Sequence, residues 1–564
     1  MSLLDDASLL VTPNAEKEGK LYSIIPTNGN GDFSVTRATT ATRVNAAGLV
    51  ELVPYNLVTD SETYSSTWGS TFASITKNLV APNGLTTGST IVNSTGVNKS
   101  IFKTFTAISG QTYQFSVYIK KISGSFSLSS AIQLTSWGTG VASQTYTNLG
   151  TTITTDWVRY THTFTATSNN TVYIQLISNE VHTFGLWGAQ LNEGALLDYQ
   201  MTETRLNIPR LDYSLGSCPN ILLEPQRTNL VLRSEEFDNG SWIKSNASVT
   251  ANATTSPSGL LNGDALIENT ATANHEIVQT TSVTTGVSYT FAIYVKANGR
   301  DKFKIQLANQ FAATALAYYD LVTGLTYSVG AAAAASMTSV GNGWFRCIIT
   351  STATSTGTAI HYSTLVSTGT TTTYLGNGTS GVFLWGAQLE AGAYATSYIP
   401  TSSASVTRNA DVINKTGVSS LIGQTQGTLY GQLHIGASDS SSTVRMIASL
   451  SNGTVNNRIE IYRFNNTIQY DNVVGGAIQF SGSVATITSF NTTMRIAIKY
   501  SLNSVKFFIN GVLVNTDTTA LIPACSQINI GTNYAGAVAF GGFINSMALF
   551  PTPLTDTQCI ALTT

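Results

Sequence analysis

The chain carries one ordered series of motifs twice. Residues 184–191 (FGLWGAQL) return as residues 383–389 (FLWGAQL), and residues 110–120 (GQTYQFSVYIK) return as residues 286–296 (GVSYTFAIYVK). Shorter matches keep the same order: residues 157–159 (WVR) with 344–346 (WFR), and Asn56-Leu57 with Asn229-Leu230. Copies this far apart indicate a duplicated domain, because the units of solenoid proteins recur about every 20–50 residues. The chain therefore folds as at least two related modules.

Both copies contain strands in which apolar and polar side chains alternate. The apolar positions are Tyr113, Phe115, Val117 and Ile119 in the first copy, and Tyr289, Phe291, Ile293 and Val295 in the second. A period of two is typical of a strand with one face buried and one face exposed. Several such strands, separated by turns rich in Gly, Asn and Ser, predict a sandwich or jelly roll. We expect an all-β protein of tandem antiparallel β-sandwich or jelly-roll domains.

Composition excludes several classes of partner. Only 10% of the 564 residues are charged and the net charge is −2, whereas a nucleic-acid-binding surface needs clustered basic residues. No run approaches the roughly 18 apolar residues of a membrane span, and the first residues lack the features of a secretory signal. We expect neither nucleic-acid binding nor membrane insertion.

The four cysteines are Cys218, Cys347, Cys525 and Cys559. They form no CxxC pair and no metal-ligand spacing, and so few thiols suit a chain that folds in a reducing cytoplasm. We expect them to be unpaired. A bond between Cys525 and Cys559 stays open, because both fall in the last domain.

Residues 413–564 have a different pattern. Apolar residues alternate over 494–500 and over 505–509, and Asn510-Gly511 separates two apolar strands. Asn-Gly in this setting is a strong hairpin signal, because both turn positions need a positive φ. Residues 554–562 are expected to form a short helix capped by Thr555 or Asp556.

These patterns divide the chain into five parts. Residues 1–54 are too few to bury a core of their own, so we expect an extended, weakly folded segment that attaches to a trimer of the chain or to another structural protein. The other parts are a first jelly roll (55–204), a connector (205–219), a second jelly roll (220–412) and a last sandwich (413–564).

Motifs over roughly residues 30–412 resemble the carbohydrate-binding-module-like jelly roll of fibre and tail proteins of tailed bacteriophages. They are residues 209–213 (PRLDY), 222–230 (LLEPQRTNL), 234–242 (SEEFDNGSW), 293–297 (IYVKA), 340–347 (VGNGWFRC), 384–392 (LWGAQLEAG), 397–401 (SYIPT) and 406–411 (VTRNAD). The first copy departs from the pattern: its lead-in is only residues 49–51 (LVE), and residues 199–202 (YQMT) replace the SYIP ending.

A second resemblance covers roughly residues 425–564. Residues 507–514 (FFINGVLV), 528–531 (INIG) and 542–550 (GFINSMALF) are similar to the last strands of concanavalin-like, laminin-G-type sandwiches. That family implies glycan or protein binding, sometimes with calcium. Calcium takes about six to eight oxygen ligands, whereas Asp439, Asp471 and Asp517 are isolated in the sequence. We expect no metal and no cofactor.

The sequence offers little support for catalysis. It has no GxSxG nucleophile motif and no phosphate-binding GxxxxGK[ST] motif, and its five histidines lie outside metal-binding motifs. Glycoside hydrolysis needs two carboxylates about 5–9.5 Å apart. The candidates, Glu193 with Glu390 and Glu235 with Glu236, lie beside glycines or a turn. We expect no enzymatic activity.

Five residues are candidates for glycan contact. Tyr118 and Tyr294 lie on the outward side of equivalent strands, two residues before a lysine; the alternative is burial under a loop or a neighbouring subunit. Tyr470, Asn533 and Tyr534 fall at expected loop edges, where binding residues concentrate. Trp187 and Trp385 are expected in the two cores, with a sugar-stacking surface as the alternative.

The fibre resemblance implies a virion protein of a phage, made in the cytoplasm of a bacterial host. It would form a homotrimer, attach to other virion structural proteins through residues 1–54 and bind host-surface glycans without catalysis. Trimerisation would multiply weak sites through effective concentration. A structural decoration or adaptor protein of the capsid or tail, and a polysaccharide depolymerase, are the alternatives.

Overall fold

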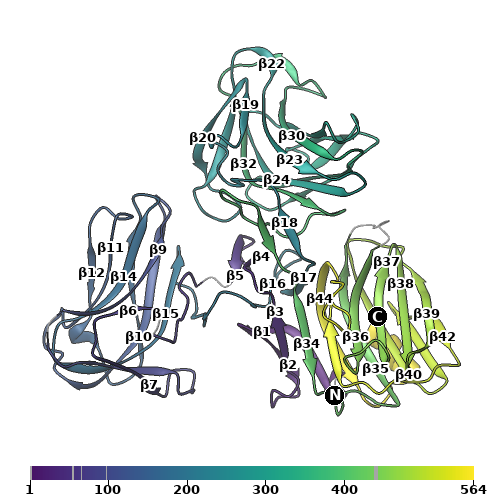
Figure 1. The fold of residues 1–564 in the computed structure, drawn as a ribbon, viewed down its shortest axis with the longest axis horizontal. Helices are drawn as coiled ribbons and strands as arrows, with labels where there is room; N and C mark the ends of the chain where they lie inside the picture. The colour runs from purple at the N-terminus through teal and green to yellow at the C-terminus, as the bar shows by residue number, and fades with distance from the viewer. Residues whose placement is uncertain (1–2, 54–55, 65–66, 97, 437–442) are drawn as a thin grey trace. The chain divides into compact units, whose positions relative to one another are not determined.

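The computed structural model describes residues 3–53, 56–64, 67–96, 98–436 and 443–564. Their regular structure is almost entirely antiparallel β-sheet, as the sequence predicts (Figure 1). The chain forms two compact units, Val53–Leu206 and a second unit made of Met1–Leu52 with Asn207–Thr564. The expected boundary at 54/55 lies outside the described residues. Among those described, no helix has the length and apolar character needed to cross a membrane.

Unit Val53–Leu206 is jelly roll 1, a sandwich of two five-stranded sheets ordered β13-β10-β15-β8-β7 and β12-β11-β14-β9-β6. Tyr113, Phe115, Val117 and Ile119 of β10 all lie in the core between the sheets, as their alternation predicts. The strands are β6 (Gly69–Ser70), β7 (Ser74–Leu79), β8 (Gly88–Asn93), β9 (Lys99–Thr106), β10 (Thr112–Gly124), β11 (Ile132–Trp137), β12 (Thr145–Asn148), β13 (Val158–Thr165), β14 (Thr171–Ser178) and β15 (His182–Glu193), with a 3₁₀ turn η2 (Gly150–Thr152).

Jelly roll 2 repeats this plan with two six-stranded sheets, ordered β19-β23-β30-β25-β26-β27 and β20-β21-β32-β24-β29-β28. Its predicted core residues Tyr289, Phe291, Ile293 and Val295 are buried together. The strands are β18 (Arg227–Asn229), β19 (Ile243–Ser245), β20 (Ala247–Thr254), β21 (Gly263–Glu268), β22 (Thr272–Asn274), β23 (Glu276–Val283), β24 (Ser288–Asn298), β25 (Lys302–Ala308), β26 (Leu316–Asp320), β27 (Leu325–Val329), β28 (Ala334–Ser339), β29 (Trp344–Thr352), β30 (Gly357–Val366), β31 (Thr373–Leu375), β32 (Gly381–Ala391) and β33 (Val406–Arg408).

The C-terminal sandwich contains strands from both ends of the chain. Its sheet runs β39-β38-β37-β36-β43-β34-β3-β2-β1-β44-β35-β40-β41-β42. The strands are β1 (Leu9–Lys17), β2 (Lys20–Ile25), β3 (Phe33–Thr36), β16 (Leu211–Asp212), β17 (Asn220–Leu223), β34 (Val412–Thr416), β35 (Gln426–Ile435), β36 (Val444–Ser451), β37 (Arg458–Phe464), β38 (Thr467–Val474), β39 (Ala477–Thr486), β40 (Thr492–Ser501), β41 (Ser504–Ile509), β42 (Val512–Asp517), β43 (Gln527–Ile530) and β44 (Gly542–Phe550), preceded by a 3₁₀ turn η1 (Leu3–Asp6).

The N-terminal segment therefore differs from the extended, weakly folded leader that the sequence suggested. Strand β1 pairs with β44, and β3 pairs with β34, so β1–β3 join the two layers of the sandwich (Figure 1). Leu9, Val11 and Phe33 are fully buried in the sandwich core. The segment is too short to bury its own apolar side chains, and it buries them against strands from the far end of the chain.

A second part of the N-terminal segment packs on jelly roll 2. The hairpin of β4 (Ala41–Val44) and β5 (Val50–Val53) places Val50 in a cluster with Tyr294, Trp385 and Tyr398. The amide N–H of Val50 also donates to the carbonyl of Pro257 at 3.0 Å. Residues 41–53 thus cover the outward side of the jelly-roll strand that carries Tyr294.

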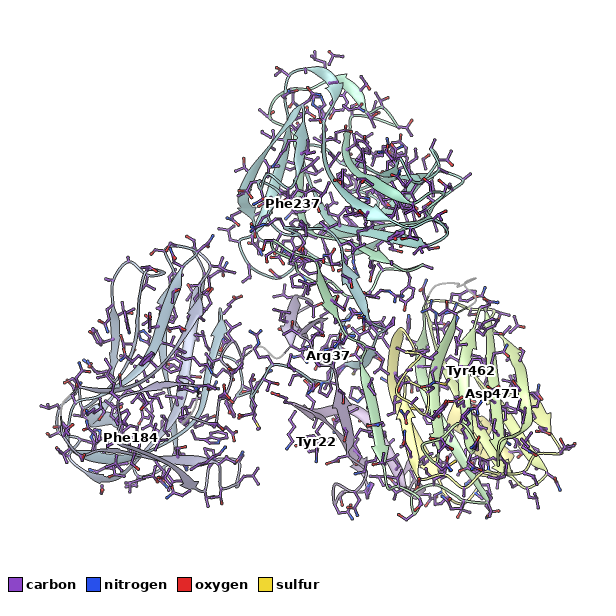
Figure 2. The ribbon with its side chains drawn as sticks, viewed as in Figure 1. Tyr22, Arg37, Phe184, Phe237, Tyr462 and Asp471 are labelled. Atoms are coloured by element: carbon purple, nitrogen blue, oxygen red, sulfur yellow. The ribbon has the colours of Figure 1, made fainter. Side chains whose placement is uncertain are left out.

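Five buried charged side chains connect the N-terminal segment, the connector, jelly roll 2 and the C-terminal sandwich, which belong to one compact unit. Asp411 accepts from Arg37 at 2.7 Å and from Arg210, while Glu224 accepts from Arg210 at 2.7 Å and forms an ion pair with Arg408 at 2.8 Å. The five side chains, which we call the ion cluster, are each at most 8% exposed. Arg37, labelled in Figure 2, follows β3, whereas Arg210 precedes β16 and Asp411 precedes β34. The cluster therefore ties the N-terminal segment and the connector to both sandwiches.

Local features of the last domain agree with the sequence. Asn510 and Gly511 both have positive φ, 46° and 80°, between β41 and β42. Helix α1 (Asp556–Thr563) begins after Thr555, whose hydroxyl accepts from the N–H of Gln558. All four cysteines are free.

Candidate functional site

The structure places Tyr294 inside the protein, so it is no outward platform for a sugar. Its ring lies 5.1 Å from Trp385 and 6.2 Å from Tyr398, centroid to centroid, and only 4% of the residue is exposed. The β4–β5 hairpin covers it, and the Arg346 guanidinium lies 5.4 Å from its centroid. Burial under a loop, the alternative to an exposed sugar platform, is therefore what the structure shows for Tyr294. Alternation shows which side of a strand is outward but not what later covers that side.

Tyr118 has the same packing in jelly roll 1. It lies 5.1 Å from Trp187 and 6.2 Å from Tyr199. Trp187 is 3% exposed and Trp385 2%, so both repeated tryptophans are buried. They pack beside these tyrosines on the outward side of the sheets, whereas the sequence placed them in the two cores. The glycine after each, Gly188 (φ 65°) and Gly386 (φ 61°), leaves room for the tyrosine, since a Cβ there would lie 3.1 or 2.9 Å from that ring. The repeated WGAQL motif thus serves packing.

Tyr470 lies within β38, away from any loop edge. It is fully buried between Phe480 and Phe507, at centroid distances of 5.7 and 4.7 Å. Burial raises the pKa of its hydroxyl well above the usual value. The residue belongs to the sandwich core, and the prediction of glycan contact fails on burial.

Asn533 and Tyr534 do lie in a loop, between β43 and β44. Asn533 Oδ1 accepts the backbone N–H groups of Ala535 at 3.1 Å and of Ala537 at 2.9 Å, which shapes that loop. The Tyr534 ring is partly exposed, with the Arg458 guanidinium 6.0 Å from its centroid. Their contact with a glycan stays a prediction.

The carboxylates considered as catalytic groups or calcium ligands accept hydrogen bonds within the fold instead. Glu390 is fully buried and accepts from the Thr396 N–H at 2.6 Å, and Glu235 accepts from the Tyr398 hydroxyl at 3.0 Å. Asp471 accepts from Tyr462 and Ser481 (Figure 2). Asp439 lies outside the described residues. Across the described ranges, no three His, Cys, Asp or Glu side chains gather as metal ligands.

An exposed group of aromatic rings lies elsewhere, on the outer side of the β12-β11-β14-β9-β6 sheet of jelly roll 1. Trp137 of β11 stands directly opposite Tyr173 of β14, and their rings stack at 4.0 Å with an interplanar angle of 11°. Trp137 Nε1 donates to Gln175 Oε1 at 2.8 Å, which fixes the indole. Phe102 of β9 lies 5.8 Å from Tyr173. We call Phe102, Trp137, Tyr146, Tyr173 and the amides Gln133 and Gln175 the aromatic face.

The aromatic face is accessible. Trp137 is 37% exposed and Tyr146, on β12, is 50% exposed. The inward side of the same strands carries Leu134, Ile174 and other core residues. None of the six side chains is charged, so the surface combines apolar rings with neutral hydrogen-bonding groups.

Jelly roll 2 shows that the fold does not require this stack. When the buried residues Ile132 and Leu134 of β11 are matched with Phe303 and Ile305 of β25, Trp137 corresponds to Ala308. Ala308 stands opposite Ile360, as Trp137 stands opposite Tyr173. The same sheet therefore forms with two small or aliphatic side chains at these positions.

Sequence reasoning missed Trp137, although a signal was present. Six of the seven tryptophans fall into repeated pairs, which are Trp68 with Trp242, Trp157 with Trp344 and Trp187 with Trp385. Trp137 alone has no counterpart. An unrepeated tryptophan in a duplicated domain is unnecessary for the shared core, and alternation from Leu134 places it on the outward side.

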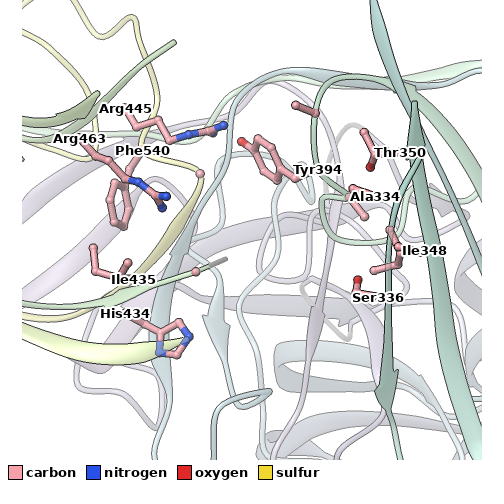
Figure 3. Close-up of a pocket in the computed structure, with 15 residues that line it drawn as sticks. Ala334, Ser336, Ile348, Thr350, Tyr394, His434, Ile435, Arg445, Arg463 and Phe540 are labelled. Carbon is pink, nitrogen blue, oxygen red and sulfur yellow. The ribbon is translucent and has the colours of Figure 1, made fainter. Parts of the chain in front are cut away.

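A cavity of about 400 Å³ lies between jelly roll 2 and the C-terminal sandwich (Figure 3). The Arg445 guanidinium lies 4.3 Å from the Tyr394 ring centroid, and Arg227 lies 5.4 Å from the same ring. Arg463 Nε donates to the Asn465 carbonyl at 2.8 Å. These contacts engage the guanidinium groups with their own chain, so the cavity walls are structural.

Comparisons with known proteins give fold likeness only. No family model matches the chain, and no curated protein matches it. The CBM40 domain of the Ruminococcus gnavus IT-sialidase is similar, with 20% identity over 26% of this chain and 91% of that one, at a TM-score of 0.23. Domain 4 of a GH43 arabinanase from Geobacillus stearothermophilus has 16% identity over 28% of this chain and 73% of that one, at a TM-score of 0.23. The binding domain of botulinum neurotoxin serotype G has 14% identity over 27% of this chain and 39% of that one, at a TM-score of 0.23. Scores this low assign neither family nor ligand.

Proposed function

We propose that this chain is a non-catalytic glycan-binding protein and that the aromatic face of jelly roll 1 is its binding surface. A sugar ring presents a side of C–H groups that packs on an aromatic ring, and a rim of hydroxyls that needs hydrogen-bonding groups. Trp137 and Tyr173 supply the rings, and Gln133 and Gln175 supply neutral amides. The observation that carries the proposal is the exposed, unrepeated Trp137, which jelly roll 2 replaces with Ala308.

The setting that we propose is a fibre or appendage of a tailed-phage virion, on the head or the tail. The motif resemblance over residues 30–412 supports it. A homotrimer would present three aromatic faces, and linked weak sites gain affinity by effective concentration. Strands β1–β3 are built into the sandwich of their own chain. Attachment to other virion proteins through residues 1–54 would therefore use the outer sides of these strands.

The binding test compares Trp137→Ala with Tyr327→Ala in the full-length chain. Tyr327, on jelly roll 2, is 38% exposed and so matches Trp137 in exposure. We expect Trp137→Ala to weaken binding to host cells and their purified surface polysaccharide about tenfold, which equals roughly 1.4 kcal/mol. Tyr327→Ala should bind as the unmodified chain does. Equal binding by both variants would refute the aromatic face as the site.

The virion setting needs a separate test. A gold label at the C-terminus, viewed on purified virions, should lie on a projecting fibre. A label held against the capsid or tail body would favour the structural decoration or adaptor protein. Release of reducing ends from host polysaccharide by the purified chain would favour the depolymerase instead.

A further inference from the structure

A second hollow, of about 620 Å³, opens on the outer side of the C-terminal sandwich. Its floor is formed by Gln432 and His434 of β35, Thr493 of β40 and Asn545 of β44. Its wall is the loop 214–218 between β16 and β17. We call it the amide pocket.

The fold builds this pocket in two ways. Strand β17 pairs with β44, with Ile221 opposite Ile544, so the β16–β17 loop lies over the end of the sheet. The pairing of β35 with β44 then slips by one residue at Asn545, since Gln432 faces Ser546 and Leu433 faces Ile544. A bulge of this kind re-aims a side chain, and here the extra residue, Asn545, lines the pocket.

The lining is polar and uncharged. Carboxamides come from Asn220, Gln432, Asn491 and Asn545, and hydroxyls come from Ser214, Ser217, Thr492 and Thr493. No Asp, Glu, Lys or Arg belongs to the lining residues, all of which lie in the described ranges. A carboxamide both donates and accepts, which matches the hydroxyls of a sugar, whereas a charged ligand would find no opposite charge. Burial lowers the pKa of His434, which disfavours the charged form of its imidazole.

Some of these groups are held in place and others are available. Asn545 Nδ2 donates to Asn220 Oδ1 at 3.4 Å, and Asn220 Nδ2 donates to the Cys218 carbonyl at 3.4 Å. Gln432 Oε1 accepts from the Tyr430 hydroxyl at 3.5 Å. Within the described part of the chain, Gln432 Nε2 has no acceptor, so it can donate to a ligand.

We propose that the amide pocket binds an uncharged saccharide of one to three rings. Its volume falls in the range of about 300–1,000 Å³ that is usual for small-molecule sites. The pocket belongs to the C-terminal sandwich and the aromatic face to jelly roll 1, so either site can fail alone. The proposal therefore stands apart from the proposed function, although both sites would serve carbohydrate recognition.

Cys218 provides a direct readout in the natural chain. It lines the pocket and is exposed, whereas Cys347, Cys525 and Cys559 are buried. Alkylation by N-ethylmaleimide, followed by peptide mass spectrometry, therefore reports on access to the pocket. The probes are millimolar lactose, maltotriose, cellotriose and chitotriose, with sialyllactose as the charged comparison.

We expect at least one neutral probe to slow the alkylation of Cys218 saturably. At about ten times its dissociation constant a sugar fills about nine-tenths of the sites, so the rate should fall about tenfold. Asn545→Ala and Gln432→Ala, each checked for folding by circular dichroism, should lose this protection. Gln479→Ala, an equivalent change on β39 outside the pocket, should keep it, and so should Trp137→Ala.

Three outcomes would overturn the proposal: no protection by any neutral probe, protection by sialyllactose alone, or protection that survives both pocket substitutions. Loss of host-cell binding in Trp137→Ala with intact protection of Cys218 would separate the two sites. Unchanged host-cell binding in Trp137→Ala, again with intact protection of Cys218, would refute the aromatic face and leave the amide pocket standing.

Discussion

At the scale of single residues, the repeated motifs explain the fold rather than a ligand. Asn229 Nδ2 donates to the carbonyls of Ala387 at 3.1 Å and Ile399 at 2.8 Å, and its Oδ1 accepts from the Leu389 N–H at 3.0 Å. Asn56 makes the same set of bonds in jelly roll 1. Each asparagine anchors the segment that leaves its jelly roll, which is why it recurs in both copies.

Replacing this anchor should destabilise one jelly roll. Asn229→Ala leaves buried backbone groups without partners, and each such group costs about 1–3 kcal/mol. We expect faster hydrogen exchange in peptides of β32 and of residues 397–401. Asn83→Ala, at an exposed turn, is the control. Unchanged exchange in Asn229→Ala would show that the anchor is dispensable.

Two buried histidines should make stability depend on pH. Burial lowers the pKa of His162 to about 4 and that of His361 to about 3. The unfolded chain takes up a proton near pH 6.5 that the folded chain does not accept. Stability should therefore fall as the pH drops from about 6.5 towards 4. His162→Gln should flatten this dependence in urea titrations of jelly roll 1, and an unaltered slope would contradict the assignment.

At the scale of elements, local sequence predicted what each strand buries but not which strand it pairs with. The alternation in β10, β24, β40 and β41, the Asn510-Gly511 turn and the cap of α1 all follow from neighbouring residues. The pairing of Leu9 with Leu549 does not, because alternation in β1 shows only that one side is apolar. For the same reason, alternation in β24 did not show that the β4–β5 hairpin covers Tyr294. Trp137 could have been predicted as a surface residue, because the sequence shows that it has no counterpart in the second copy.

The N-terminal strands should carry much of the stability of the C-terminal sandwich. Phe33 of β3 is fully buried in its core, and truncating such a ring to alanine costs about 3–5 kcal/mol. We expect Phe33→Ala to lower the urea midpoint of this sandwich, with faster hydrogen exchange in β34 and β44. Tyr22→Ala, on the partly exposed side of β2 (Figure 2), should have little effect. Equal effects would argue against a core role for β3.

At the scale of the whole molecule, the ion cluster joins parts of the chain that are distant in sequence. Burial raises the pKa of Asp411, but Arg210 and Arg37 outweigh that effect and hold it below its usual value. The carboxylate thus stays ionised in the folded state. Its contribution to stability is present above the usual pKa and is lost as the pH falls below it.

Breaking the ion cluster should destabilise both jelly roll 2 and the C-terminal sandwich. Asp411→Ala leaves buried arginines without their partner, and removing one partner of a buried pair costs about 3–5 kcal/mol. We expect a lower calorimetric transition and faster exchange in peptides of β17, β33 and β34. Asp301→Ala, at a carboxylate 49% exposed, is the control. Peptides of jelly roll 1, which has its own core, give an internal reference.

The pairing of β1 with β44 has a consequence for synthesis on the ribosome. Strands β1–β3 leave the ribosome long before β44, since Leu9 is translated 540 residues (549 − 9) ahead of its partner Leu549. At about 5–20 residues per second, the first strands wait roughly half a minute to two minutes for their partners. Leu9, Val11 and Phe33 stay without their final cover during that time. A chain released before β44 has been made cannot close this sandwich, and the apolar side chains of its first strands stay exposed.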